Sequence, residues 1–209
     1  METPYSGFLN IEGDTLTACS QESGMVIVPP QVKVIGESAF EDSGVEYVIL
    51  PEGLHTIEKM AFAGCPKLYM VDMSKTDVKI IPPSAFSDCP ELHYVHFPDC
   101  LREIGEWAFS ECNNLQEVIL PGYVTKVGKG AFNPCRNVKR VVIPECLGEV
   151  ESDSFAFYTH SLDYMMLPEQ YGPDKDNVGD FAFGEEYIYI SPGIHFYNPE
   201  PDWDNMDEA

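Results

Sequence analysis

The stretch Leu101-Arg-Glu-Ile-Gly-Glu-Trp-Ala-Phe-Ser-Glu-Cys-Asn-Asn-Leu-Gln-Glu-Val-Ile-Leu-Pro121 decides the fold, because close copies of it recur along the chain. Its Ala-Phe pair, or Ser-Phe in one copy, marks each copy. The seven phenylalanines are separated by 22, 24, 23, 23, 23 and 28 residues, and they are Phe40, Phe62, Phe86, Phe109, Phe132, Phe155 and Phe183. A fixed period of about 20 to 29 residues is typical of stacked-repeat architectures.

Other positions of the unit repeat in step with the phenylalanine. Four residues before the Ala, or the Ser of the one variant copy, stands a β-branched aliphatic residue: Ile35, Ile57, Ile81, Ile104, Val127, Val150 and Val178. Three residues after the Phe, four copies have a cysteine: Cys65, Cys89, Cys112 and Cys135. A short apolar run, such as Val118–Pro121, then closes the unit, and an eighth run, Val26–Pro29, precedes the first phenylalanine.

The closing apolar runs predict one strand in each coil, because they are short, rich in β-branched residues and bounded by Pro or Gly. The Ala-Phe-x-x-Cys stretch is compact and is followed by turn-forming residues, so we expect one helical or 3₁₀ turn there. Such a unit cannot bury its own apolar side. Stacking of neighbouring coils supplies the burial.

The repeating unit closely resembles the BspA-like leucine-rich repeat, and the resemblance covers about residues 26–191. It implies a leucine-rich-repeat solenoid: a curved, right-handed superhelix with a parallel β-sheet on its concave face and short helical or 3₁₀ turns. It also implies a role in adhesion and partner binding, often at microbial surfaces. The resemblance implies no catalytic residues.

Three regions are expected along the chain. Residues 1–25 lack the phenylalanine unit and are predicted to cap the first coil, because terminal repeats need a cover. Residues 26–191 form the array of about seven repeats, interrupted by a polar loop at 169–176. Residues 192–209 are predicted to be an acidic tail.

The charge balance restricts the class of partner. The chain has 12 basic and 35 acidic residues, for a formal net charge of −23. Nucleic acid and anionic membranes are therefore excluded as partners, since binding to phosphate needs a basic surface. Two interpretations stay open: a highly charged, solvated surface that keeps the chain soluble, or attraction of cationic partners or divalent cations.

The cysteines predict buried, reduced thiols. No close Cys-x₂-Cys pair suits zinc. The four repeat cysteines are expected to point inward about 4.8 Å apart with parallel side chains, which is poor geometry for a disulfide. Cys100 and Cys146 occupy matching positions two coils apart, about 10 Å from one another, which is too far to bond.

No catalytic, metal or cofactor site is predicted. His93 and His96 are spaced so that a strand places them on opposite faces. The segment 174–185 partly imitates a calcium loop, but Val178 stands where an oxygen ligand belongs. No nucleophile, phosphate loop or metal set recurs at motif spacing.

Localisation stays open in the sequence. The first 30 residues lack a basic start and a continuous apolar core, so either a signal peptide is missing or the protein is intracellular. Unpaired cysteines favour a reducing compartment, whereas the family resemblance favours the cell surface or secretion. No membrane insertion is predicted.

The predicted binding site is the exposed face of the sheet. Residues directly before and after the central residue of each strand should point away from the core. These positions are rich in Tyr, Ile and Met, and a contiguous apolar patch is typical of an interface, although β-propensity alone also favours these residues in strands. The candidate binding residues are Tyr47, Ile49, Tyr94, His96, Ile119, Val142, Tyr164, Met166, Tyr187 and Tyr189.

The sequence therefore predicts a non-catalytic binding module for a protein partner, with a glycan as the alternative ligand. The competing hypothesis is a structural or scaffolding segment of a larger assembly, with no ligand of its own. We expect a monomer under the first hypothesis and self-association under the second.

Overall fold

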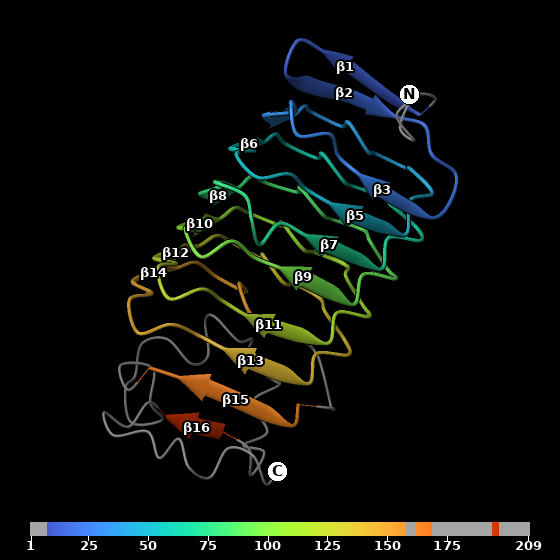
Figure 1. The fold of residues 1–209 in the computed structure, drawn as a ribbon. Helices are drawn as coiled ribbons and strands as arrows, with labels where there is room; N and C mark the ends of the chain where they lie inside the picture. The colour runs from blue at the N-terminus through green and yellow to red at the C-terminus, as the bar shows by residue number, and fades with distance from the viewer. Residues whose placement is uncertain (1–7, 158–161, 169–193, 197–209) are drawn as a thin grey trace, which may run out of the picture.

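The computed structural model describes residues 8–157, 162–168 and 194–196. The chain winds into a stack of similar coils (Figure 1). The hairpin of β1 (Leu9–Glu12) and β2 (Thr15–Cys19) lies at one end, and β15 (Tyr164–Leu167) and β16 (Ile194–Phe196) lie at the other. Strands of successive coils pair in parallel. The fold is therefore the parallel-strand β-solenoid that the repeat predicts.

The longer strands of the coils lie side by side along the stack and all run in the same direction (Figure 1). They are β3 (Met25–Ile27), β5 (Tyr47–Ile49), β7 (Met70–Asp72), β9 (Tyr94–His96), β11 (Glu117–Ile119), β13 (Arg140–Val142) and β15 (Tyr164–Leu167). Their registers match repeat to repeat, so that Val48 lies opposite Val71 and Val71 opposite Val95. The central residue points inward, because successive side chains of a strand alternate between faces.

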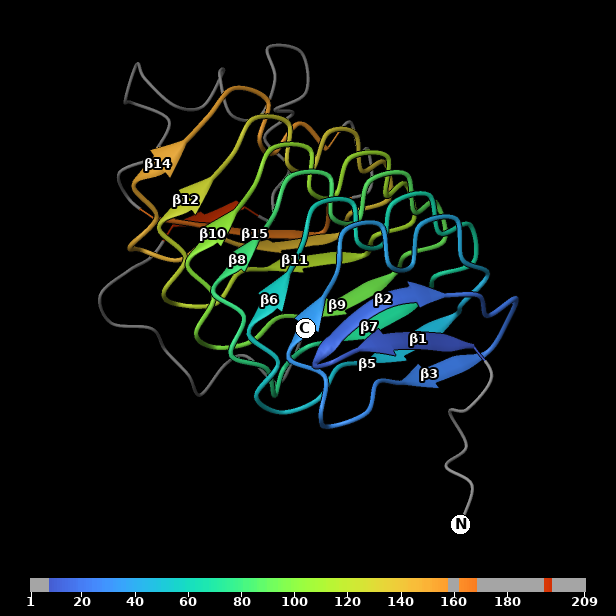
Figure 2. The ribbon, with the colours of Figure 1, turned by 90° about the horizontal axis from the view of Figure 1, so that it is seen from above.

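Each coil has a second strand as well, which the sequence did not predict. These strands are β4 (Val34–Ile35), β6 (Thr56–Ile57), β8 (Ile80–Ile81), β10 (Glu103–Ile104), β12 (Lys126–Val127) and β14 (Glu149–Val150). They form a separate row on another side of the stack (Figure 2). The repeated aliphatic residue is the second residue of each, and two residues are too short a run for periodicity to reveal.

The second row is interrupted between β6 and β8. In other coils the residue after the short strand donates its N–H to the preceding coil, as Gly105 N does to Ile81 O at 2.8 Å. Pro82 occupies this position after β8 and has no N–H to donate. The row therefore divides into β1-β2-β4-β6 and β14-β12-β10-β8.

The prediction of helical or 3₁₀ turns around the Ala-Phe pair is wrong for the described residues, in which these segments are non-helical turns. The residue before the Ala, or before the Ser of the variant copy, has φ between 55° and 58° in Ser38, Met60, Ser84, Trp107, Gly130 and Asp153. A second left-handed residue follows in most of these turns: Asp42, Gly64, Asp88 and Glu111. A left-handed residue cannot continue a right-handed helix, so the chain turns instead.

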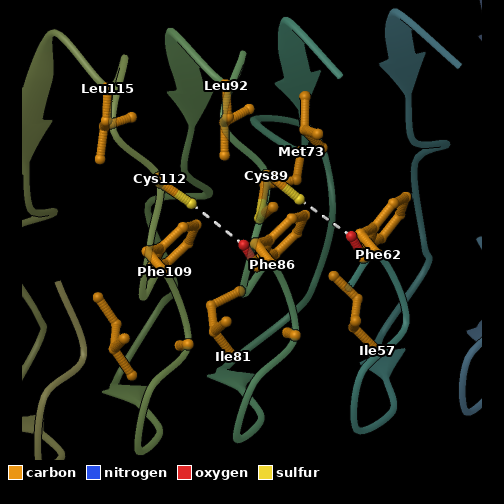
Figure 3. Packing of buried hydrophobic residues seen from close by; sticks show 14 of the residues in the cluster. Ile57, Phe62, Met73, Ile81, Phe86, Cys89, Leu92, Phe109, Cys112 and Leu115 are labelled. Atoms are coloured by element: carbon orange, nitrogen blue, oxygen red, sulfur yellow. Dashed lines mark hydrogen bonds between the residues drawn. The ribbon is translucent and has the colours of Figure 1, made fainter. Parts of the chain in front are cut away.

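The repeated phenylalanines form a continuous stack through the core (Figure 3). Successive ring centroids from Phe40 to Phe155 are separated by 4.6, 4.8, 5.0, 5.2 and 5.7 Å, with nearly parallel planes. All six rings are buried. The nearly equal spacing of the phenylalanines in the sequence therefore corresponds to one ring per coil, and the seventh residue, Phe183, lies outside the described residues.

The repeat cysteines form a second internal column beside the rings. Each Sγ donates a hydrogen bond to the carbonyl oxygen of the phenylalanine in the preceding coil, as Cys89 does to Phe62 and Cys112 to Phe86, both at 3.1 Å (Figure 3). Cys65 and Cys135 repeat the contact at 2.9 and 3.2 Å. The four thiols are buried, as the sequence predicts, and they are free cysteines.

The two ends of the stack differ from the repeats. At the N-terminal end, β1 (Leu9–Glu12) and β2 (Thr15–Cys19) form an antiparallel hairpin, and β2 pairs in parallel with β4. At the other end the partner of β15 is β16 (Ile194–Phe196). The repeat also has a closing apolar run at residues 188–191, and this run lies outside the described residues. Residues 169–193, with the predicted loop, are outside the described part.

Candidate functional site

The outward positions of the longer strands form a surface that we call the long-strand face. Its fourteen residues are exposed or half-buried, whereas the central residues between them, Val95 excepted, are buried. Ten are apolar or aromatic, and four, Asp72, His96, Glu117 and Arg140, are polar. The residues are Met25, Ile27, Tyr47, Ile49, Met70, Asp72, Tyr94, His96, Glu117, Ile119, Arg140, Val142, Tyr164 and Met166.

The second row of strands presents a different surface. Its later outward positions are charged: Glu103 lies opposite Lys126, and Lys126 opposite Glu149. The Lys126 Nζ is 3.3 Å from the Glu149 carboxylate and 3.8 Å from that of Glu151. The earlier outward positions of this row, Val34, Thr56 and Ile80, are uncharged. The contrast with the long-strand face therefore concerns the coils from β10 to β14.

An aromatic cluster lies at one edge of this face. Tyr69 stacks on His93 with ring centroids 4.4 Å apart, and it contacts Tyr47 at 5.6 Å and Tyr94 at 5.9 Å. The four rings come from three successive coils, because Tyr69 and His93 directly precede β7 and β9. The cluster therefore joins three coils at the edge of the face.

The sheet under the face is interrupted between β9 and β11. The ladder of longer strands divides into β3-β5-β7-β9 and β11-β13-β15-β16. In neighbouring coils the residue after the strand donates its N–H across, as Met73 N does to His96 O at 3.0 Å and Leu120 N to Val142 O at 3.0 Å. No such bond joins Phe97 N to Ile119 O in the part of the chain that the structure describes. The two strands are therefore separated at this point.

Phe97 explains the separation. Equivalent positions in the other coils hold Leu50, Met73, Leu120, Ile143 and Leu167, all buried. Phe97 is only half-buried, and its ring stands edge-on against Phe109 at 5.7 Å and 90°. The space beside the phenylalanine stack suits an aliphatic side chain, and a second ring does not fit fully inside a close-packed core.

A hollow opens on the long-strand face at this interruption. Its volume is about 290 Å³. Val95 is half-buried at its floor, although the central residues of the other longer strands are buried. The residues that line the hollow are Tyr94, Val95, His96, Phe97, Asp99, Glu117, Ile119 and Pro121.

The charges around the hollow are mainly negative. His96 Nδ1 lies 3.9 Å from a carboxylate oxygen of Asp72. Burial opposes ionisation of Asp72, but the Ser74 amide and hydroxyl donate to the same carboxylate oxygen at 3.0 and 2.7 Å. These bonds, with the charges of His96 and Lys75, lower the pKa of Asp72 below its ordinary value. Asp72 is therefore an anion at neutral pH.

The structure gathers part of the predicted binding set. Tyr94, His96 and Ile119 meet at the hollow. Val142 lies opposite Ile119 on the next strand, and Met166 lies opposite Val142. Tyr164 follows in the other column of the same face, opposite Arg140, and Tyr47 and Ile49 lie on β5, two strands before the hollow. Tyr187 and Tyr189 fall outside the described residues.

Sequence reasoning missed several residues of the site. Val95, Phe97, Asp99 and Pro121 line the hollow, and Tyr69 belongs to the aromatic cluster. The available signal was Phe97 itself, the one aromatic residue in a column that is otherwise aliphatic among the described coils.

The other chemical groups that the sequence singled out lie apart from the hollow or form no site there. Among the described residues no three His, Cys, Asp or Glu side chains are grouped to hold a metal ion. His93 stacks on Tyr69, and its Nδ1 lies 2.7 Å from Glu91 O. Burial raises the pKa of the Cys89 and Cys112 thiols, so both stay protonated. In the described part, no helix is long and apolar enough to cross a membrane.

Comparisons with known proteins agree with this geometry. The family model for the BspA type leucine rich repeat region matches six copies over residues 9–117 and 79–188. A comparison with curated protein sequences gave no match.

Solved structures with the same fold include three bacterial proteins. A T. pallidum leucine rich repeat protein is 25% identical with a TM-score of 0.61, over 82% of this chain and 88% of that one. A leucine rich cell surface protein from Faecalibacterium prausnitzii A2-165 is 24% identical with a TM-score of 0.63, over 78% of this chain. A leucine-rich repeat protein from Bacteroides ovatus ATCC 8483 is 23% identical with a TM-score of 0.56, over 82% of this chain. The chain spans 48% and 47% of the length of the last two.

Proposed function

The chain belongs to the BspA-type leucine-rich-repeat family, and on that premise we propose that it is a non-catalytic binding module that recognises a protein partner through its long-strand face. The family and its fold are typically non-catalytic. Function in a solenoid rests on the surface that the stacked coils present.

The observation that carries the proposal is the line of exposed apolar side chains on this face. Met25, Ile27, Tyr94 and Ile119 are 53%, 42%, 37% and 42% exposed, and all four lie on the longer strands. Contiguous exposed apolar surface on a soluble protein marks an interaction site. Tyrosine adds large contact area at low entropic cost, as binding surfaces prefer.

The dimensions of the face suit a protein better than a metabolite. Seven strands spaced about 4.8 Å apart extend over about 29 Å. Small-molecule sites are usually enclosed pockets of about 300–1,000 Å³, whereas the hollow is open and about 290 Å³. A glycan is the alternative ligand, since the cluster of Tyr47, Tyr69, His93 and Tyr94 offers ring surfaces for stacking.

Display at a cell surface, in adhesion, is part of the proposal. The solved neighbour from Faecalibacterium prausnitzii is described as a cell surface protein. Its likeness to this chain concerns the fold, so the location and the adhesive role rest on the shared repeat architecture. Detection of the protein on intact cells with an antibody, before and after protease shaving, tests the location.

A scaffolding role is the second candidate. The same exposed apolar face suits self-association, in which two copies cover each other's Tyr94 and Ile119. Sedimentation velocity separates the candidates. A concentration-independent monomer supports the binding module, and a dimer abolished by Ile119→Asp supports the scaffold.

Affinity capture with matched variants tests the binding face. Tyr94→Ala and Ile119→Asp remove contacts on the long-strand face. Tyr123→Ala and Ile80→Asp are matched controls, since Tyr123 and Ile80 are 59% and 51% exposed and lie off this face. We expect the first pair to lose a protein that the wild type captures and the control pair to retain it, with melting temperatures nearly unchanged. Normal capture by Tyr94→Ala and Ile119→Asp would refute the proposal.

A further inference from the structure

The hollow between β9 and β11 combines an apolar floor with an acidic rim. Val95, Phe97, Ile119 and Pro121 supply apolar surface. Asp99 and Glu117 are the two carboxylates in the lining, and the described lining contains no lysine or arginine. A side chain that fits this hollow needs an apolar stem and a cationic end, because burial of an unpaired carboxylate is costly.

Tyr94 adds a ring face over which the described residues place no lysine or arginine. Elsewhere the described chain places arginine over tyrosine twice: Arg102 lies 4.7 Å from the Tyr123 ring centroid, and Arg140 lies 5.5 Å from that of Tyr164. In the second pair the arginine and the tyrosine are cross-strand neighbours on the long-strand face.

The position beside Tyr94 on the hollow side is different. In the pair on β13 and β15 the arginine lies on the strand before the tyrosine. The strand before Tyr94 carries Met70 at that position, and the strand after it, β11, carries Glu117 in the same column. The ring contacts of Tyr94 within the described residues are with Tyr69 and His93. An arginine from outside would therefore find the aromatic partner and a carboxylate together.

We infer that the hollow binds an arginine side chain of the protein partner. Its aliphatic stem packs on Val95 and Ile119, its guanidinium lies against Tyr94, and Asp99 and Glu117 accept its hydrogen bonds. Arginine is favoured over lysine, because the planar guanidinium stacks on rings and pairs with carboxylates in a fixed fork. The inference rests on the proposed function and specifies the chemistry of the partner.

The charge of the whole chain supports a cationic partner. A formal net charge of −23 attracts positively charged segments over a long range. Long-range attraction alone gives no preference for one place on the surface. The hollow supplies that preference, since it joins the carboxylates to an apolar floor and a tyrosine.

A titration with three blocked tripeptides tests the inference. The probes are acetyl-Gly-Arg-Gly-amide, its citrulline analogue, which has the same shape without charge, and its lysine analogue. Chemical shifts of the full chain, labelled with ¹⁵N and with ¹³C in its methyl groups, report the contact. We expect saturable shifts centred on Val95, Phe97 and Ile119 with the arginine peptide, at least tenfold weaker binding of the lysine peptide, and no saturation with citrulline.

Charge-matched variants separate the hollow from general attraction. Asp99→Asn with Glu117→Gln should weaken arginine binding at least tenfold. Glu41→Gln with Asp14→Asn changes the net charge equally at exposed positions in the first coils, away from the hollow, and it should leave binding unchanged. The inference is overturned if citrulline binds as well as arginine, if the shifts spread over the acidic surface, or if both double variants behave alike. Each of these results leaves the capture experiment with Tyr94→Ala and Ile119→Asp to decide the proposed function separately.

Discussion

Removal of one ring from the phenylalanine stack has a calculable cost. Phe109 is fully buried near the middle of the stack. Its ring lies 5.0 Å from Phe86, 5.2 Å from Phe132 and, edge-on, 5.7 Å from Phe97. Truncation of a buried phenylalanine to alanine costs about 3–5 kcal/mol through lost burial and the cavity left behind.

The ring contacts place Phe109→Ala toward the upper end of that range. Each favourable aromatic pair contributes about 0.5–1.5 kcal/mol beyond its buried area, and Phe109 makes three such contacts. Relaxation of neighbours into the cavity offsets part of the loss. We expect the free energy of unfolding to fall by about 4–5 kcal/mol, the upper part of the range for such truncations.

Equilibrium unfolding in urea, followed by circular dichroism, measures this change. Phe8→Ala is the control, because it makes the same chemical change at a side chain that is 52% exposed. We expect the control to lose less than about 1 kcal/mol, as surface substitutions do. A loss of under about 1 kcal/mol for Phe109→Ala would show that the ring is not packed in the stack and that the repeat register is wrong.

Three further predictions follow from the thiols and the interrupted sheet. Burial raises the folded-state pKa of Cys89 above its ordinary value of 9.0, so its contribution to stability is complete below pH 9 and is lost as the pH rises above it. The free energy of unfolding in urea should therefore fall less steeply with pH in Cys89→Ala than in the wild type between pH 9 and 10.5, by up to about 1.4 kcal/mol per pH unit. Equal slopes would contradict the burial of the thiol. A water-soluble thiol reagent should label Cys100 and Cys146 at most in the native chain, and mass spectrometry that finds two or more disulfides would refute reduced thiols. Phe97→Leu should let β9 and β11 pair and slow hydrogen exchange at the amide of residue 97, and unchanged exchange would show that Phe97 does not cause the interruption.

The sequence predicted the elements that repeat. The columns of Phe109, Ile104 and Cys112 recur in enough copies to establish a solenoid and to place these side chains in the core, where the structure has them. The outward direction of Tyr94 and Ile119 followed from strand alternation. These features depend on the spacing of residues along the chain, which can be measured in a single sequence.

Features that depend on local geometry were not predicted. The two-residue strands, such as Glu103–Ile104, are too short to show a hydrophobic period. Left-handed residues such as Trp107 were not foreseen, because bulky residues rarely adopt that conformation. The hollow arises where the repeat is broken, at Phe97. Its presence depends on how that ring packs, which the sequence does not show. The roles of the long-strand face and of the hollow in binding therefore stay predictions, which the capture and titration experiments test.

The most direct test of the long-strand face is site-specific photo-crosslinking. A benzophenone amino acid in place of His96 samples the rim of the hollow, and the same amino acid in place of Tyr123 samples exposed surface away from the face. We predict that position 96 crosslinks to the captured partner, through a peptide that mass spectrometry shows to contain arginine, and that position 123 does not. Crosslinking from position 123 without crosslinking from position 96 would contradict binding at the long-strand face.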